Sequence, residues 1–317
     1  MKTTPKLSIA PMIDWTNSPF RVLMRLLAPK ALLYTEMQTI GAITHNPTRA
    51  LDFDAVEKPV ALQVGGSDLK GLIAAAKLAE SYGYDEINLN LGCPSAKVQA
   101  GSFGACLMKE KSLVMDLVKG MKDAVSIPVT TKTRIGVDDC DSFDFFHDFS
   151  EGLIEAGSQK LVIHARKAWL KGLNPKQNRT IPPVQYDYVY RLKKQNPATA
   201  MVINGDIKTI PDIDTHLSTV EGVMLGRLAC DNPYAMALIH QHLYPEIPIL
   251  SRQAALLAYL DYANQAHAKG LNIGILIKPI MNLSFGLPNG KKYKDCLASG
   301  LRQKDWSKIM ASFVNIE

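Results

Sequence analysis

Residues 86–108 read EINLNLGCPSAKVQAGSFGACLM, and the stretch begins with a short apolar run that Asn88 and Asn90 interrupt. The run is typical of a buried strand that carries polar groups toward its end. A glycine ends this strand, and a proline two residues later prevents a helix from starting at once, so Cys93 lies on the turn between them. Two interpretations of Cys93 stay open here: a small residue that fills a corner, or a thiol that serves a site.

Similar apolar runs recur along the chain, and helical segments separate most of them. The eight expected strands are residues 7–12, 32–37, 59–64, 86–91, 128–134, 160–165, 200–204 and 222–225. Several are almost continuously apolar, as in parallel strands that are covered on both faces. Eight such units in about 230 residues predict a TIM barrel, an α/β fold. A doubly wound sheet is the alternative, but the sequence lacks the GxGxxG turn that would normally follow its first strand.

Apolar residues at helical spacing predict amphipathic helices at residues 67–81, 112–125 and 252–269. Strand-like runs stop after about residue 235. We therefore expect a barrel domain over residues 1–240 and a helical domain over residues 241–317.

The composition indicates an ordinary globular protein, with 47% hydrophobic residues among 317. No apolar run reaches the roughly 18 residues that span a membrane, and the first residues lack the hydrophobic segment of a signal peptide. The five cysteines are scattered and form no CxxC pair. We therefore expect a cytoplasmic protein with free thiols.

Polar residues gather where the expected strands end, and in a TIM barrel these ends form the active-site face. They are Gln63, Asn90, Cys93, Lys132, Arg134, His164, Arg166, Asn204, Asp206 and Arg227. Each has an ordinary structural explanation by itself, such as a core hydrogen bond or a surface ion pair. Together with the end of the first strand, APMID at residues 10–14, seven strand ends agree and predict a shared ligand site.

The pattern also predicts the chemistry of the ligand. Gly205 and Gly226 lie beside polar residues at the ends of the last two strands, which is typical of a barrel phosphate site, and Arg227 can neutralise a phosphate. A cation at Lys132 suits an electron-rich, partly anionic ring such as a reduced flavin. No cluster of carboxylates or histidines has metal-ligand spacing, so we expect no metal.

Taken together, these motifs resemble those of the tRNA-dihydrouridine synthases. The resemblance covers about residues 7–240 and rests on APMIDWTNSPFR, LLYTEM, ALQVGG, EINLNLGCPS, KTRIG, IHAR, NGD and LGR. Residues 164–183, HARKAWLKGLNPKQNRTIPP, are similar to the A-type bacterial subgroup, which reduces uridine at positions 20 and 20a of the tRNA D-loop. The resemblance implies FMN as cofactor, NADPH as reductant, and reduction of the carbon 5–carbon 6 double bond of uracil.

The resemblance also implies roles for single residues. Hydride passes from the flavin to carbon 6, and Cys93 donates the proton to carbon 5, which suits a thiol with an ordinary pKa of about 8.5. Asn90 and Arg134 face the substrate base. The implied flavin ligands are Pro11 and Met12 through the backbone, then Gln63, Lys132, His164, Asn204, Gly205, Asp206, Gly226 and Arg227. The subgroup often has glycine in place of Asp206, so we expect only the backbone of that residue to bind.

Two basic segments are candidate tRNA contacts, because cations bind the phosphate backbone. The first follows the sixth strand and contains Arg166, Lys167, Lys171, Lys176 and Arg179. The second contains Lys291, Lys292 and Lys294, followed by Arg302 and Lys304. An ordinary solvated surface is the alternative, since a net charge of +6 is also common among enzymes.

Two other functions fit part of the sequence. An FMN barrel that acts on a free pyrimidine, similar to the dihydroorotate dehydrogenases, would explain the strand ends but not the basic segments. A tRNA-binding chaperone would explain the basic segments but would leave Cys93 and the flavin residues without a role. Cys106 has no comparable support, and we expect it to be a packing residue.

Overall fold

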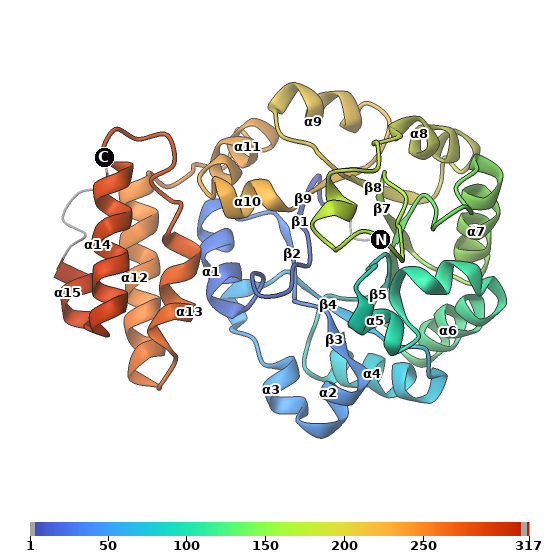
Figure 1. The fold of residues 1–317 in the computed structure, drawn as a ribbon, viewed down its shortest axis with the longest axis horizontal. Coiled ribbons are helices and arrows are strands. Elements are labelled where there is room, and N and C mark those ends of the chain that lie inside the picture. Colours follow the sequence, from blue (N-terminus) through green and yellow to red (C-terminus); the bar gives the residue numbers. More distant parts are fainter. Residues whose placement is uncertain (1–3, 312–315, 317) are drawn as a thin grey trace.

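The computed structural model describes residues 4–311 and residue 316, and its centre is a closed barrel of eight parallel strands (Figure 1). The barrel strands are β1 (Leu7–Ile9), β2 (Leu32–Tyr34), β4 (Val60–Gly65), β5 (Glu86–Leu91), β6 (Val129–Arg134), β7 (Lys160–His164), β8 (Ala200–Asn204) and β9 (Gly222–Leu225). Pairing of β1 with β9 and of β2 with β4 closes the barrel. The predicted TIM barrel is confirmed, and the doubly wound alternative is wrong.

The second expected strand is shorter than predicted. β2 ends at Tyr34, and a separate two-residue strand, β3 (Gln38–Thr39), pairs with the end of β4. Beyond β2 the hydroxyl of Thr35 accepts the N–H of Gln63 at 3.0 Å. A hydrogen bond from the Gln63 backbone to a side chain therefore replaces the backbone–backbone hydrogen bonds of the sheet at this point.

Helices surround the barrel, and each expected helix there is confirmed. The longer ones are α1 (Ser18–Leu27), α4 (Leu69–Ser81), α6 (Lys111–Ala124), α7 (Phe143–Glu155), α8 (Tyr186–Gln195), α9 (Ile210–Leu217) and α11 (Ala235–Leu243). The shorter elements are α2 (Ile40–His45), α3 (Pro47–Leu51), η1 (Ala55–Glu57), α5 (Ala96–Ala100), η2 (Gly104–Lys109), η3 (Gln177–Arg179) and α10 (Arg227–Asp231). The start of α4 has a local cause, because the Asp68 carboxylate accepts the N–H of Gly71 at 2.7 Å and caps the helix.

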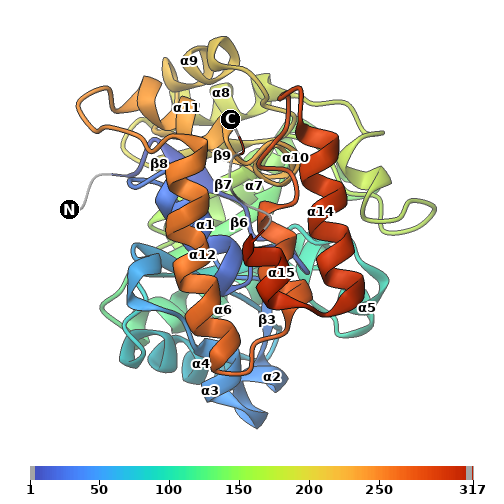
Figure 2. The same ribbon diagram turned by 90° about the vertical axis from the view of Figure 1, so that its left-hand side faces the viewer.

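The C-terminal helices gather at one side of the barrel, as both views show (Figures 1 and 2). They are α12 (Arg252–Ala268), α13 (Ile273–Ile277), η4 (Lys278–Ile280), α14 (Gly290–Gln303) and α15 (Trp306–Ala311). α12 confirms the helix expected at residues 252–269. The domain boundary at residue 240 stays a prediction, and the outer limits at residues 1 and 317 lie outside the described residues.

Specific hydrogen bonds tie the C-terminal helices to the loops of the barrel. The ammonium of Lys278 donates to the carbonyl of Asp14 at 2.7 Å, and Asn282 donates to the carbonyl of Cys230 at 2.9 Å. Within the part of the chain that the structure describes, no helix has the length and apolar character needed to cross a membrane.

The interior of the barrel has an apolar half and a polar half. The apolar half contains Ala10, Leu32, Tyr34, Ala61, Val162, Val202 and Met224. The polar half includes the buried side chains of Gln63, Glu86, Asn88, Asn90 and Thr130 on β4, β5 and β6. Buried polar groups need hydrogen-bond partners, and these side chains bond to one another along the barrel axis, directly below the candidate site.

Candidate active site

The carboxyl ends of the strands bring the predicted site residues into adjacent positions. The register pairs Asn90 with Lys132, Arg134 with His164, and His164 with Asn204. These residues are far apart in sequence, yet parallel pairing places them at one end of the barrel. The shared ligand site that the strand ends predicted therefore has the required geometry.

Cys93 lies on the turn between β5 and α5, and hydrogen bonds hold both sides of the residue. Its N–H donates to Oδ1 of Asn90 at 3.0 Å, and its carbonyl accepts the N–H of Ala105 at 2.9 Å. Burial raises the pKa of the half-buried thiol, although the N–H of Ser95 and the cations nearby act in the opposite direction. The thiol therefore keeps its proton at neutral pH, as a general acid must.

Lys132 is a cation that has no anionic partner in the part of the chain that the structure describes. Its ammonium donates to Oδ1 of Asn204 at 3.1 Å. Desolvation, with the neighbouring Arg134, lowers the pKa of Lys132 to about 7. A desolvated charge is costly unless it is paired, so this position favours an anionic or electron-rich ligand.

His164 lies beside Lys132 and is held neutral. Burial lowers the pKa of its imidazole well below the ordinary value, and Arg134 and Lys132 act in the same direction. A neutral imidazole has one donor and one acceptor nitrogen, which suits the polar edge of a ring. Gly205 lies against this imidazole with φ of +125°, and a Cβ atom there would meet Cδ2 of His164 at 2.9 Å.

A group of cations surrounds Asp206 at the ends of β8 and β9. Its carboxylate lies 2.8 Å from Lys208, 3.5 Å from Arg166 and 3.8 Å from Arg227. The Lys208 ammonium keeps the pKa of Asp206 below its ordinary value. Nε of Arg166 is buried and has no hydrogen-bond partner among the described residues. The side chain of Asp206 is thus occupied by cations, and the expectation that only its backbone binds a ligand stays a prediction.

The side chain of Gln63 lies inside the barrel below these groups. Its Nε2 donates to Oδ1 of Asn88 at 2.8 Å, and its Oε1 accepts from Nδ2 of Asn90 at 2.8 Å. One amide hydrogen of Gln63 remains for a ligand. Its predicted role as a flavin ligand therefore depends on that single hydrogen and stays a prediction.

The segment after β1 offers fewer backbone groups than expected. The N–H of Met12 already donates to the hydroxyl of Thr16 at 3.0 Å. Pro11 has no N–H, so its carbonyl is the polar group that it can offer. The predicted flavin contacts of Pro11 and Met12 stay predictions.

Asn90 and Arg134, the expected contacts of the substrate base, both support the loops around Cys93. Arg134 is 3% exposed and donates to the carbonyls of Gly92 (2.9 Å), Lys167 (2.9 Å) and Asn178 (3.0 Å). Asn90 is 9% exposed. Their contacts with a base stay predictions, and the structure adds a supporting role that the sequence did not indicate.

The basic loop after β7 divides into surface and interior cations. Lys176 is exposed, whereas Arg166 is buried and its guanidinium donates to the carbonyl of Pro182. Lys167 bonds to Asp141 at 2.6 Å. The expectation that Arg166 belongs to the RNA surface is therefore wrong, because its side chain is enclosed by the protein.

Arg179 ends η3 and is exposed, close to the barrel mouth. Its carbonyl accepts from Arg227 at 3.3 Å. Partial desolvation and Arg227 lower the pKa of its guanidinium. Its charge also acts on the Cys93 thiol, so Arg179 connects the loop surface to the site.

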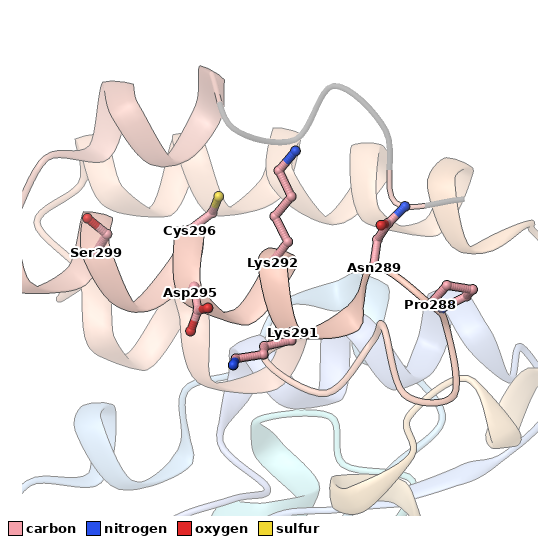
Figure 3. A pocket seen from close by; sticks show the side chains of 7 residues that line it. All are labelled: Pro288, Asn289, Lys291, Lys292, Asp295, Cys296 and Ser299. Carbon is pink, nitrogen blue, oxygen red and sulfur yellow. The ribbon is translucent and has the colours of Figure 1, made fainter.

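The second basic segment begins α14 and lines a groove of ≈ 520 Å³ (Figure 3). Lys292 and Cys296 project to one side of the helix, and Lys291 and Asp295 project to the other, as the spacing of four residues requires. Lys291 and Lys292 are both exposed. The residues that line this groove all belong to α14 and the segment before it, so it lies apart from the strand ends of the barrel, and the role of its lysines as tRNA contacts stays a prediction.

Sequence reasoning missed several residues that organise the site. Asn178 is buried and orders the loop by accepting the N–H of Trp169 at 2.7 Å. Tyr186 donates to the carbonyl of Gly205 at 2.5 Å. Asn88 and Thr130 could have been found, because each is two residues before a predicted site residue and residues two apart share a face of a strand.

An α/β barrel with a protonated thiol and a group of cations at its strand ends is an enzyme-like site, and comparison with known proteins identifies its class. Residues 8–314 match the model of the Dihydrouridine synthase (Dus) family. The chain belongs to this family, as the sequence motifs indicated, and membership decides against a free-pyrimidine enzyme and against a chaperone.

Relatives that are similar over nearly their whole length carry a more specific name. The tRNA-dihydrouridine(20/20a) synthase of Yersinia pestis is 46% identical over 291 residues, which cover 91% of this chain and 84% of the relative. That of Xanthomonas campestris pv. campestris is 47% identical, with 93% and 88% covered. That of Pasteurella multocida is 48% identical, with 87% and 85% covered.

Proposed function

We propose that this protein reduces uridine to dihydrouridine at positions 20 and 20a of the tRNA D-loop, the reaction for which its similar relatives are named. The observation that carries the proposal is the placement of Cys93. Its protonated thiol lies on a turn that hydrogen bonds hold on both sides, near the charges of Arg134, Arg179 and Lys132. A weak acid held beside a ligand site is what protonation of a uracil carbon requires.

We propose FMN as the cofactor and NADPH as the reductant. When bound, the flavin supplies the hydride that reduces carbon 6 of uracil. Lys132 fits this group, because among the described residues its desolvated ammonium has an amide oxygen but no carboxylate as its partner. His164 and Gln63 are proposed to bind the ring, and the phosphate is proposed to bind at Asn204, Gly205, Gly226, Arg227 and the backbone of Asp206.

Arg166 is an additional phosphate candidate. Its buried Nε lacks a partner among the described residues, and a guanidinium binds phosphate oxygens in a bidentate manner. Its position in the sequence did not indicate this role, because it lies in a run of basic residues that are otherwise typical of a surface. Its burial beside Asp206 supports a role for Arg166 at the phosphate end of the proposed site.

The side chains around the substrate would hold the uracil base in position and supply the proton that it takes up. Cys93 would donate its proton from Sγ to carbon 5, and Arg134 would keep the neighbouring loops in place. Reduction of a base needs its removal from the stack, and exposed cations would hold the backbone meanwhile. Lys176, Arg179, Lys291 and Lys292 are the proposed tRNA contacts, and residues 241–317 are proposed to form the helical RNA-binding domain. The cytoplasmic location stays a prediction.

Mass spectrometry of unmodified tRNA incubated with the protein, FMN and NADPH tests the proposal. We expect the mass of two hydrogen atoms to be gained at uridines 20 and 20a. A reaction without NADPH is the control for the reductant. Gain at another position would contradict the site specificity, and no gain by a protein that has bound both FMN and tRNA would contradict the activity.

A further inference from the structure

A buried carboxylate lies at the opposite end of the barrel interior from Cys93. Glu86 begins β5 and pairs with Lys160 at 2.5 Å, and it accepts the hydroxyl of Tyr34 at 2.8 Å. The hydroxyl of Thr130 also donates to Glu86, at 2.5 Å. An ionised carboxylate only accepts hydrogen bonds, so the hydroxyl hydrogen of Thr130 is directed toward Glu86.

A chain of side-chain hydrogen bonds starts from that hydroxyl and runs toward the active-site face. Thr130 accepts from Nδ2 of Asn88 at 2.9 Å. Oδ1 of Asn88 accepts from Nε2 of Gln63 at 2.8 Å, and Oε1 of Gln63 accepts from Nδ2 of Asn90 at 2.8 Å. Oδ1 of Asn90 then accepts the N–H of Cys93 at 3.0 Å.

The direction of every bond in this chain follows from the first one. Because Thr130 donates to the carboxylate, it must accept from the amide nitrogen of Asn88, which directs the Asn88 oxygen toward Gln63. The same reasoning directs the oxygen of Asn90 toward the turn. A reversed Asn90 amide would place its NH₂ group against the N–H of Cys93, leaving two donors opposite each other and an unsatisfied buried group.

We propose that Thr130 and Asn88 are positioning residues for Cys93: they transmit the orientation of the buried Glu86 carboxylate through Gln63 and Asn90 to the turn that carries the thiol. In this series of hydrogen bonds, neither Thr130 nor Asn88 bonds directly to the turn that carries Cys93. Their effect is to favour, from the Glu86 end, the same orientation of the Gln63 and Asn90 amides that the N–H groups of Gly92 and Cys93 require at the turn, at 3.1 Å and 3.0 Å from Oδ1 of Asn90. The inference rests on the proposed function for the role of the thiol, but not for the geometry of the turn.

Thr130→Val is the central variant, because valine has nearly the shape of threonine and removes only the hydroxyl that connects Glu86 to Asn88. Thr130→Ser keeps that hydroxyl. Thr131→Val is the matched control, since Thr131 is also fully buried on β6 but bonds to Ser158 at 3.0 Å, outside this chain. Melting temperatures of Thr130→Val and Thr131→Val measure how much stability the protein loses when a buried hydroxyl is removed.

Two measurements on these variants report the position of the turn. Hydrogen exchange at the N–H of Cys93 is expected to be about fivefold faster in Thr130→Val, as for the loss of one hydrogen bond. The kcat for dihydrouridine formation by the FMN-loaded enzyme is expected to fall at least about tenfold, with an unchanged KM for tRNA, because a displaced acid affects the chemical step. Thr130→Ser is expected to match the unmodified protein in both, and Thr131→Val is expected to change neither.

The two measurements separate this inference from the proposed function. Faster exchange without any dihydrouridine formation, even by the unmodified protein, would support the positioning chain and reject the function. Equal exchange and equal kcat in Thr130→Val and Thr131→Val would overturn the inference. If Thr130→Val does not fold, Asn88→Ser interrupts the chain at another link, and rapid exchange of the Cys93 N–H in the unmodified protein would overturn the inference without any variant.

Discussion

The ammonium of Lys132 on β6 donates a 3.1 Å hydrogen bond to Oδ1 of Asn204 on β8, across the mouth of the barrel. This neutral amide oxygen is the only acceptor of that ammonium among the described residues. Desolvation lowers the pKa of Lys132 from 10.5 to about 7. The charge at the centre of the site therefore changes near neutral pH in the ligand-free protein.

Binding of FMN is expected to weaken as the pH rises above about 7. An electron-rich ring favours the protonated lysine, so binding raises the pKa of Lys132 and takes up a proton, and the dissociation constant rises by up to about tenfold per pH unit between the two pKa values. Quenching of flavin fluorescence between about pH 6 and about pH 9 measures this effect. Riboflavin, measured in parallel, removes the contribution of phosphate ionisation.

The same group has a predictable effect on stability without a ligand. The folded protein binds fewer protons than the unfolded chain between pH 10.5 and about 7, so the contribution of Lys132 to the free energy of unfolding increases with pH in this range.

Lys132→Arg, which stays charged, is expected to flatten the pH dependence of FMN binding. An equally steep dependence in this variant would assign the titration to another group.

Cys93→Ala is expected to abolish dihydrouridine formation while FMN and tRNA still bind, because only the proton donor is removed. Cys106→Ala is the matched control, since that half-buried thiol donates to the carbonyl of Phe103 at 3.1 Å and lies on η2. Mass spectrometry of the product tRNA measures both. Because burial raises the pKa of Cys93 above its ordinary value, activity limited by this acid should persist from neutral pH into the alkaline range and be lost only as the thiol ionises. Turnover by Cys93→Ala would show that another group is the acid.

Asp206→Asn is expected to tighten FMN binding about twofold to fivefold, the range for a partly exposed ion pair. The carboxylate pairs with Arg166 and Arg227 and would compete with the phosphate for them at the proposed site, and asparagine tolerates the positive φ of 54° at this position. Fluorescence titration measures the change. Riboflavin lacks the phosphate, and its affinity should stay the same; a parallel gain for riboflavin would show that competition at the phosphate is not the cause.

Gly205→Ala is expected to weaken FMN binding about tenfold, because the new methyl group would displace the His164 ring that lies 2.9 Å away. Gly172→Ala is the matched control, since Gly172 also has a positive φ, of 82°, but nothing lies within 4 Å of its Cβ position. Both variants carry backbone strain, and only the first affects the site. Similar affinities for the two variants would mean that the His164 position does not depend on Gly205.

Neutralising Lys176, Lys291 or Lys292 to Gln is expected to weaken tRNA binding and to reduce the slope of log affinity against log salt by about 0.7–0.9 for each phosphate that the variant no longer binds. Lys119→Gln is the control, because the Lys119 side chain is 67% exposed on α6 and pairs with Asp123. Binding measured at several salt concentrations gives the slopes. Slopes equal to that of Lys119→Gln would place these lysines outside the RNA-binding surface.

The barrel could be predicted without coordinates because parallel strands covered on both faces must be apolar for most of their length. The runs around Val60 to Val64 and Leu161 to Ile163 have this property, and each is buried. The active-site face followed, since the carboxyl ends of such strands lie together. The same reasoning located Cys93, because the glycine before it and the proline after it exclude both strand and helix at that position.

Residue types and their order established the fold, the family and the set of candidate site residues, because these depend on local hydrophobicity and on short motifs. Only the folded chain decided which groups are partners. Arg166 is an interior cation in contact with Asp206, and hydrogen bonds through side chains of two other strands connect the Asn90 amide to Glu86. Hydrogen bonds between strands join residues that are 25 to 44 positions apart, and their direction depends on a buried carboxylate that can only accept. No local pattern carries that information, so it appears only when the barrel has closed.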